Sequence, residues 1–313
     1  MKLRVARAAS AARDIRLFEL RHPAGEALPA FTPGAHVTVS VPGGARREYS
    51  LCNDPADRSR YEIAVKRDAS GHGGSVSLVD GVREGDTLEV GAPRNAFELA
   101  PRAPSFIFIA GGIGITPIVC MVRHLAAGGT RGFRLYYCTR SPEETAFREE
   151  LSTPGLQPSV KIHHDGSDPA RALDLWPILE KPSAAHVYCC GPRSMLEAVR
   201  DMTGHWPASA VHFESFVDAA AAQRPEDRAF TVVLAKSGAR IEVPPGVSIL
   251  EAMRVRGHAA PSSCESGTCG TCRTALVAGE PDHRDLVLAE EERAREIMIC
   301  VSRARSPELV IDR

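Results

Sequence analysis

Four of the nine cysteines in this 313-residue chain have a spacing that could bind a metal cluster. Cys264, Cys269 and Cys272 follow the pattern C-x4-C-x2-C, and Cys300 lies 28 residues further on. This spacing is one of those that bind [2Fe–2S] clusters, in which four thiolates hold two irons. Zinc sites usually pair two short C-x2–4-C motifs, and Cys300 has no nearby partner. The sequence therefore predicts a [2Fe–2S] cluster, with a zinc site or unligated thiols as the alternatives.

Small residues around these thiols suit a loop that wraps closely around a cluster. Gly267 and Gly270 permit close approach of the backbone, and Ser266, Thr268 and Thr271 add little bulk. Backbone N–H groups that face the sulfurs would spread the negative charge of the cluster. The composition of the loop therefore agrees with the cysteine spacing.

A second set of residues suits a phosphorylated ring system. Arg47, Tyr49 and Ser50 form an R-x-Y-S pattern. In a strand, Arg47 and Tyr49 share one face and Ser50 points to the other. The guanidinium offers a planar fork to a phosphate, and the tyrosine offers a flat face and a hydroxyl. An exposed arginine on an ordinary strand is the alternative.

A glycine-rich turn about 25 residues later supports the binding interpretation. Gly73 and Gly74 precede Ser75 and Ser77, where a helix is predicted to begin. Helix N-termini bind anions through their free N–H groups, so this turn and Arg47 could hold one phosphate from both sides. A plain glycine turn with an N-cap serine is the alternative.

A third glycine-rich segment joins a predicted buried strand to a helix. Gly111, Gly112 and Gly114 lie in it, but Pro117 stands where the Rossmann fingerprint has its third glycine. A proline suits the first turn of a helix, where no N–H is needed. The segment predicts a pyrophosphate site at a helix start, with a tight strand–helix turn as the alternative.

Two further strand ends of the same region support a nucleotide site. Arg140 follows one predicted strand, near where a ribose or its phosphate would lie. Cys190, Gly191 and Pro192 follow another. Ligands of parallel sheets collect at the carboxyl ends of the strands, so these residues are predicted to lie near the glycine segment.

Regions with different hydrophobic patterns must position these residues. Residues 1–101 contain short strands separated by turns, which predicts a small antiparallel barrel. Residues 102–216 alternate apolar strands with helices, which predicts a parallel α/β sheet with right-handed crossovers. Residues 217–229 lack apolar periodicity and predict an exposed linker. Residues 230–313 form a last domain that begins with a hairpin.

Three elements within these regions are predicted from local signals. A helix is expected from about Pro142 to Leu151, and the last strand of the α/β region over Val211–Phe216. In the last domain, Ser248 is expected to cap a helix through Arg256, with Glu251 completing a capping box.

Composition excludes several classes of function. The net charge is −1 and aromatic residues make up 5% of the chain, which argues against a nucleic-acid partner. No stretch of eighteen apolar residues could span a membrane. The odd number of cysteines argues against a disulfide framework. Because Leu3–Leu20 has the pattern of the first strands of the first domain rather than that of a transit peptide, we expect a cytoplasmic protein.

The motifs and their order resemble the phthalate dioxygenase reductase family, which includes the reductases of vanillate demethylase and carnitine monooxygenase. Residues 1–101 resemble the flavin-binding barrel of the ferredoxin–NADP reductase superfamily, and residues 102–216 resemble its nucleotide domain. Residues 230–313 resemble plant-type ferredoxins. The resemblance implies an antiparallel β-barrel flavin domain, a parallel-sheet α/β NAD domain and an α+β ferredoxin domain of the β-grasp type.

The resemblance also implies which residues bind the flavin. No segment resembles an adenosine-binding extension, which favours FMN over FAD. His72 stands where relatives often carry an arginine, and it supplies less charge at neutral pH. The flavin-binding residues implied by the resemblance are Arg47, Tyr49, Ser50, Ala64, Val65, Lys66, Gly74, Ser75 and Ser77.

For NADH, the resemblance places Thr116 and Cys190 near the nicotinamide and Phe216 beside the flavin ring. A buried core aromatic is the alternative for Phe216. With Ser50, these three are the candidate catalytic residues. The remaining nucleotide-binding residues implied are Gly111, Gly112, Gly114, Arg140, Gly191 and Pro192, and the implied cluster ligands are Cys264, Cys269, Cys272 and Cys300.

The implied activity is that of a reductase component of a two-component Rieske-type oxygenase. Electrons would pass from NADH through FMN, which takes two and releases one, to the [2Fe–2S] cluster and the oxygenase partner. The alternatives are an FAD-dependent NAD(P)H reductase of a different acceptor protein and a non-catalytic metal-binding interaction protein on the same scaffold.

Overall fold

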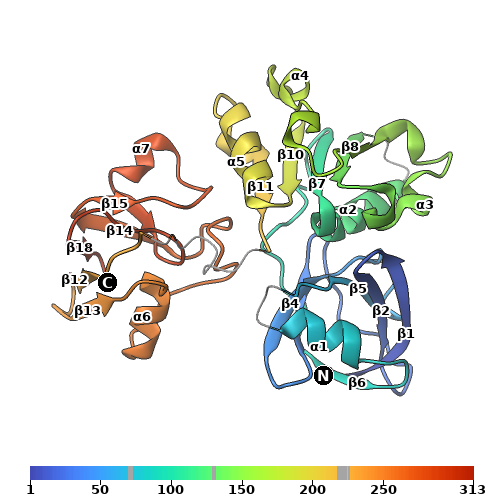
Figure 1. Ribbon diagram of the computed structural model, residues 1–313, viewed down its shortest axis with the longest axis horizontal. Helices are drawn as coiled ribbons and strands as arrows, with labels where there is room; N and C mark the ends of the chain where they lie inside the picture. Colours follow the sequence, from blue (N-terminus) through green and yellow to red (C-terminus); the bar gives the residue numbers. More distant parts are fainter. Residues whose placement is uncertain (70–72, 129–131, 217–223, 225) are drawn as a thin grey trace. The chain divides into compact units, whose positions relative to one another are not determined.

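The computed structural model describes residues 1–69, 73–128, 132–216, 224 and 226–313 (Figure 1). His72, in the predicted phosphate turn, and most of the predicted linker 217–229 lie outside the described residues. The described residues form two compact units. The first comprises Met1–Met195 and Asp201–His212, and the second comprises Leu196–Arg200 and Phe213–Arg313.

The N-terminal region forms a six-stranded antiparallel sheet in the order β4-β3-β6-β1-β2-β5, and helix α1 (Gly74–Gly81) follows β5. An isolated bridge between Leu51 and Ile63 links the end of β4 to β5, which closes the sheet into the predicted barrel. The strands are β1 (Lys2–Ala12), β2 (Ile15–Arg21), β3 (His36–Ser40), β4 (Arg46–Ser50), β5 (Tyr61–Lys66) and β6 (Thr87–Val90).

Strand β5 is apolar on both faces because it is buried on both sides. Ile63 and Val65 pack into the core of the barrel, whereas Ala64 packs into the core of the α/β region. Cys120, on the helix after the first strand of the α/β region, inserts into the barrel core in return. The barrel and the α/β region therefore share buried side chains within the first unit.

The α/β region forms a five-stranded sheet in the order β11-β10-β7-β8-β9. The pairs β10–β7, β7–β8 and β8–β9 are parallel, which confirms the predicted parallel sheet. The elements are β7 (Phe106–Gly111), β8 (Phe133–Thr139), β9 (Val160–His164), β10 (His186–Cys190), β11 (Val211–Glu214), α2 (Ile115–Ala127), α3 (Arg148–Leu151), α4 (Trp176–Leu179) and α5 (Arg193–Met202).

Two predicted elements of this region differ in the structure. The helix expected over Pro142–Leu151 is broken into a 3-10 turn, Pro142–Glu144, and the short helix α3, because Phe147 adopts a left-handed conformation with φ 58°. Strand β11 ends at Glu214, so Phe216 lies beyond the strand predicted to contain it.

The second unit contains a five-stranded sheet in the order β13-β12-β18-β14-β16 and a two-stranded sheet of β15 and β17, which agrees with the predicted ferredoxin fold. Ser248 caps α6 as predicted, because its Oγ accepts a hydrogen bond from the Glu251 N–H (3.1 Å). The elements are β12 (Phe230–Leu234), β13 (Arg240–Val243), β14 (Arg273–Ala278), β15 (Pro281–Asp282), β16 (Glu296–Met298), β17 (Arg303–Ala304), β18 (Glu308–Ile311), α6 (Ile249–Val255) and α7 (Glu290–Arg293).

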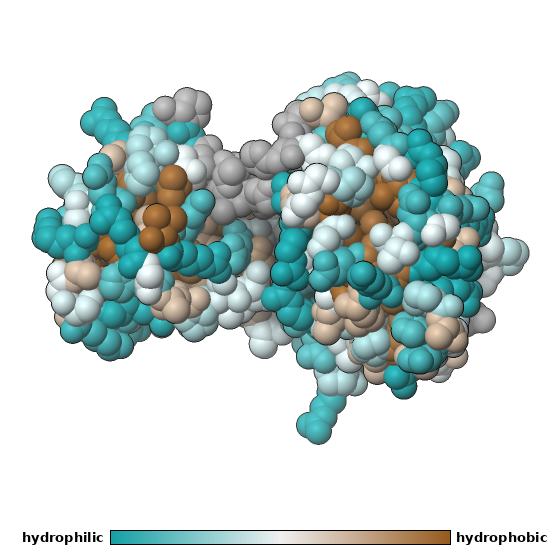
Figure 2. All heavy atoms as spheres, turned by 90° about the horizontal axis from the view of Figure 1, so that it is seen from below, coloured by the Kyte–Doolittle hydropathy of each residue, from teal (hydrophilic) through white to brown (hydrophobic). Residues whose placement is uncertain are grey.

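Polar side chains cover most of the face seen in Figure 2, with smaller apolar patches between them. Among the described residues, the most exposed large apolar side chain is that of Val255, at 78%. None of the helices traced in the described ranges is both long enough and apolar enough to cross a membrane.

Candidate functional site

The candidate phosphate-binding residues of the barrel lie together. A Cβ atom added to Gly74 would lie 2.9 Å from Nε of Arg47, so the arginine side chain lies directly against the first turn of α1. Only glycine permits this approach without displacement of the arginine. Ser77 Oγ donates to the Gly74 carbonyl (2.9 Å), and Ser75 Oγ accepts from the Asp68 N–H (3.1 Å). The structure thus places the R-x-Y-S arginine and the glycine turn side by side, as a two-sided phosphate site requires.

Ser50 carries a polar atom that a bound flavin could satisfy. Its side chain is buried, and its Oγ has no hydrogen-bond partner among the described residues. A buried hydroxyl without a partner costs free energy, so such an atom indicates a missing ligand group. Tyr49 lies on the opposite face of β4 and is partly buried, which raises the pKa of its hydroxyl to about 12. These residues therefore fit the flavin assigned to them.

Strand β5 carries the candidate flavin residues Ala64, Val65 and Lys66. Ala64 and Val65 are buried in the two cores of the first unit, so contacts from these two residues to a ligand would come from the backbone. Lys66 is partly exposed at the end of the strand.

The glycine segment and the Cys190–Pro192 loop are packed against each other at the carboxyl end of the parallel sheet. A Cβ atom on Gly114 would lie 2.2 Å from the Cys190 carbonyl oxygen, and one on Gly111 would lie 2.5 Å from Cδ of Pro192. Gly191 is also packed closely, since its Cβ position is 3.1 Å from Cα of Gly111. Both loops therefore need their glycines, and the structure brings the predicted nucleotide residues together.

Thr116 and Cys190 are both buried beside this contact, and Thr116 Oγ1 donates to the Ile113 carbonyl (3.0 Å). Gly112 has φ 53° and an open Cβ position, so the backbone there stays accessible. Arg140 is exposed after β8, and its carbonyl accepts from the Gly166 N–H (2.9 Å).

Phe216 lies in the second unit, beyond β11, with 44% of its side-chain surface exposed. It is therefore not the buried core aromatic considered as the alternative. Its place beside the flavin ring stays a prediction.

The four candidate cluster cysteines lie in two pairs in the second unit. The neighbouring thiol of Cys269 lowers the pKa of the Cys264 thiol, and the pKa of Cys269 is raised. In the same way, the thiol of Cys300 lowers the pKa of the Cys272 thiol, and the pKa of Cys300 is raised. Each pair thus brings two thiols next to each other.

The loop backbone surrounds these sulfurs. The Thr268 N–H donates to Sγ of Cys264 (3.4 Å), and the Cys264 N–H donates to Sγ of Cys269 (3.5 Å). Gly267 has φ 76°, and a Cβ atom there would lie 2.6 Å from Cγ2 of Val301. The predicted close wrapping therefore requires this glycine.

The pairing of the thiols distinguishes the candidate metal groups. A mononuclear zinc site would hold all of its ligands around one ion. Two pairs of thiols suit a group with two irons, in which each iron takes two thiolates. The donor set fits a [2Fe–2S] cluster.

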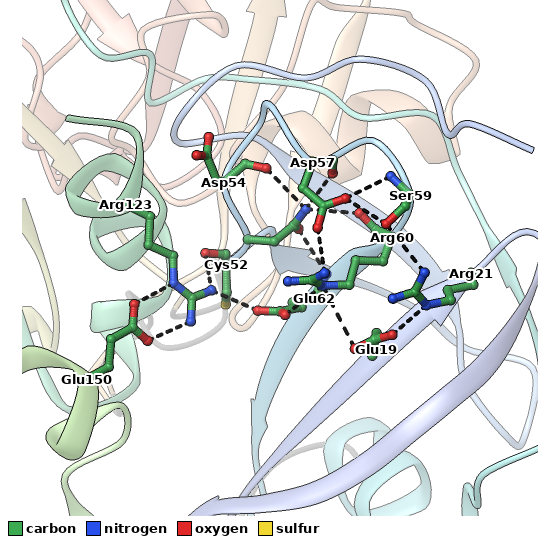
Figure 3. Close-up of polar contacts among 11 residues, drawn as sticks. Glu19, Arg21, Cys52, Asp54, Asp57, Ser59, Arg60, Glu62, Arg123 and Glu150 are labelled. Carbon is green, nitrogen blue, oxygen red and sulfur yellow. Dashed lines mark hydrogen bonds and ion pairs between the residues drawn. The ribbon is translucent and has the colours of Figure 1, made fainter. Parts of the chain in front are cut away.

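Sequence reasoning missed a set of charged residues where the barrel meets the α/β region. Arg123 on α2 bonds to Glu62 of β5 (2.8 Å) and to Glu150 of α3 (2.7 Å), as Figure 3 shows. The available signal is that α2 is uncharged and mostly apolar from Ile115 to Val122, and that Arg123 is the first charge after this run. A charge directly after so buried a stretch needs a partner.

Comparisons with known proteins identify the kind of domain that each part of the chain resembles. Three family models match successive parts of the chain: an oxidoreductase FAD-binding domain over residues 2–99, an oxidoreductase NAD-binding domain over 108–201, and a 2Fe-2S iron-sulfur cluster binding domain over 232–305. They correspond to the barrel, the parallel sheet and the cysteine-containing unit.

Similar proteins span the full chain. The chain is 55% identical to phthalate dioxygenase reductase of Burkholderia cepacia, covering 100% of this chain and 97% of that protein. It is 57% identical to the phthalate 4,5-dioxygenase oxygenase reductase subunit of Pseudomonas putida, covering 96% and 93%. A solved phthalate dioxygenase reductase, described as a modular structure for electron transfer from pyridine nucleotides to [2Fe-2S], matches with a TM-score of 0.73 and 54% identity over 100% of this chain and 98% of that one.

Proposed function

Because this chain belongs to the phthalate dioxygenase reductase family, we propose that it is a cytoplasmic protein that supplies electrons from NADH to an oxygenase of the Rieske type. The chain is an NADH-dependent flavin and iron–sulfur oxidoreductase with FMN and a [2Fe–2S] cluster as cofactors. The observation that supports the proposal is that one chain combines three features: Arg47 against the first turn of α1, two glycine loops packed at the end of a parallel sheet, and four cysteines in a domain that matches the 2Fe-2S family model.

The side chains of the barrel would bind and orient the flavin. Arg47 and the first turn of α1 would hold the FMN phosphate through a charge-assisted contact and free N–H groups. The unpartnered Ser50 hydroxyl would donate a hydrogen bond to the flavin ring, and Tyr49 would offer its ring face. When bound, the flavin accepts two electrons from the nicotinamide, and the cluster carries them onward one at a time.

The two packed loops of the α/β region would hold the nucleotide at the end of the sheet. Gly112 leaves room for the pyrophosphate, and Gly114 lets the two loops pack together. Thr116 and Cys190 lie at the position proposed for the nicotinamide. Phe216 is proposed to cover the flavin ring. Cys264 and Cys269 would hold one iron of the cluster, and Cys272 and Cys300 the other.

The partner is an oxygenase component, and we propose that this oxygenase is of the Rieske type. The names of the two similar proteins support an oxygenase partner, since both are reductases of phthalate oxygenase systems. A cluster that releases single electrons suits an acceptor that takes up single electrons.

Reconstitution tests this function. The purified full chain is combined with NADH and each of several candidate Rieske oxygenases, and the hydroxylated or demethylated product is measured. We expect turnover with at least one oxygenase and none when the reductase is left out. Rapid oxidation of NADH without turnover by any of the oxygenases, together with reduction of an unrelated acceptor protein, would contradict the proposed partner.

A further inference from the structure

One guanidinium joins the two halves of the first unit. Arg123 lies on α2, and its Nη1 donates both to the carboxylate of Glu62 on β5 (2.8 Å) and to the carbonyl of Cys52 (2.8 Å). Its Nε and Nη2 donate to the two carboxylate oxygens of Glu150 on α3, at 2.8 and 2.7 Å. Figure 3 shows this arginine between the two regions, with Glu150 on one side and Glu62 and Cys52 on the other. Four of its five N–H donors are therefore used.

The barrel end of this contact is itself held in place. One oxygen of Glu62 accepts from Arg123, and the other accepts from Nε of Arg60 (2.9 Å). The Glu62 N–H donates to Oδ1 of Asn53 (3.0 Å), whose amide nitrogen donates to the Arg60 carbonyl (2.9 Å). The carboxylate that receives Arg123 is thus also fixed by contacts within the barrel.

The contact between Arg123 and Glu62 is largely shielded from solvent, and apolar packing lies next to it. Glu62 has 10% of its side chain exposed and Arg123 has 21%. One turn before Arg123, Cys120 inserts into the barrel core, and its thiol donates to the Asn53 carbonyl (3.2 Å). Charge-assisted bonds of this kind are short and directional, so they define an orientation better than apolar contact does.

The elements that meet here are the ones that position the two cofactors. Arg123 lies two turns of α2 beyond Thr116, which is at the nucleotide end of that helix. Cys52 follows Ser50 by two residues, and Glu62 precedes Ala64 by two. A shift at Arg123 would therefore move the start of α2 relative to β4 and β5.

We infer that Arg123, through Glu62 and Cys52, is a positioning residue that sets the nucleotide-binding end of α2 against the flavin-binding strands of the barrel. The inference rests on the proposed function, because it concerns the same passage of electrons from NADH to FMN. Arg123 touches neither cofactor in this account. It acts by holding α2 and β5 in one orientation, and transfer between two bound groups falls steeply when they are misplaced.

The two carboxylates that bind Arg123 provide a matched test. Glu62→Gln weakens the contact between α2 and the barrel, whereas Glu150→Gln weakens a contact of the same guanidinium within the α/β region. Arg21→Met removes an ion pair with Glu19 (2.6 Å) that stays inside the barrel. Each full-chain variant, loaded with FMN, is mixed anaerobically with saturating NADH, and the bleaching of the flavin absorbance is followed.

We expect Glu62→Gln and Arg123→Lys to slow the limiting rate of flavin bleaching about 10- to 100-fold. FMN affinity should stay within about twofold of the parent, since no flavin contact changes. The long-wavelength charge-transfer absorbance between nicotinamide and flavin should weaken in the same variants, which loss of stability alone would not cause. Glu150→Gln and Arg21→Met should bleach at nearly the parent rate.

Two results would overturn the inference. One is a parent-like bleaching rate and charge-transfer band in folded Glu62→Gln. The other is an equal loss in Glu150→Gln, which would place the effect of Arg123 within the α/β region. If the parent protein itself is not bleached by NADH, the proposed function fails rather than this inference.

Discussion

The cluster cysteines of the second unit come from one nine-residue loop and one further position, whereas the candidate flavin and nucleotide residues of the first unit come from β4, β5, α1 and the loops after β7, β8 and β10. The first kind of site is nearly local in sequence, and its loop glycines and thiols fix most of its geometry. The second kind depends on tertiary packing, since loops far apart in sequence must meet at distances near 3 Å. A local site should therefore lose its function when one ligand residue is replaced. A distributed site should also lose its function when residues that only position it are replaced.

The largest expected effect is on the local site. Cys272→Ser replaces a soft thiolate by a hydroxyl and leaves Cys300 without its partner. We expect loss of the cluster and of all electron delivery to the oxygenase, while NADH still bleaches the flavin. Iron and sulfide content and oxygenase turnover are the measurements, with buried Cys189→Ser in the first unit as the control. Full turnover by Cys272→Ser would remove that residue from the electron path.

A truncation tests whether the two sites are separable. Asp227, which binds Arg284 (2.9 Å) within the second unit, lies beyond the proposed end of the α/β domain at Phe216. A chain that ends at Phe216 should keep FMN, oxidise NADH and reduce ferricyanide, but fail to reduce the oxygenase. Circular dichroism and the flavin content confirm that it is folded. A truncated protein that still reduces the oxygenase would show that electrons do not leave through the cluster. A truncated protein that binds FMN but does not oxidise NADH would show that the two sites do not work independently.

Arg47→Ala tests the distributed flavin site directly. A charge-assisted bond contributes about 1.5–3 kcal/mol, so FMN should bind roughly 10- to 150-fold more weakly. Fluorescence titration of the apoprotein with FMN measures the change. Arg46→Ala, on the more exposed neighbouring position of the same strand, is the control and should bind FMN normally. Unchanged FMN affinity in folded Arg47→Ala would exclude this arginine from the site.

The sequence predicted the cluster ligands, the barrel, the parallel sheet and Ser248 as a helix cap because each has a short-range signal. It did not predict the break at Phe147, since a left-handed residue other than glycine leaves no mark in a helical pattern. The predicted end of the last strand of the α/β region, at Phe216, was wrong by two residues, since β11 ends at Glu214. Arg123 and Glu62 were missed because they lie 61 positions apart, and only folding shows that they form a pair.

The smallest expected effect concerns the choice of nucleotide. Glu143 lies three residues beyond Arg140 and is exposed, and its carboxylate should repel the 2′-phosphate of NADPH. Exposed charges contribute up to about 1 kcal/mol, so kcat/KM for NADH should exceed that for NADPH by about fivefold. The preference should shrink at high salt and in Glu143→Gln. Equal or reversed preference in steady-state kinetics would assign Arg140 to the phosphate instead.

Electron paramagnetic resonance of the NADH-reduced full chain tests the central claim most directly. If electrons pass from the flavin site of the first unit to the cysteines of the second, anaerobic NADH should produce the signal of a reduced [2Fe–2S] cluster. Cys272→Ser should lose that signal while its flavin is still reduced. A protein whose flavin is reduced by NADH while an intact cluster stays oxidised would contradict the account.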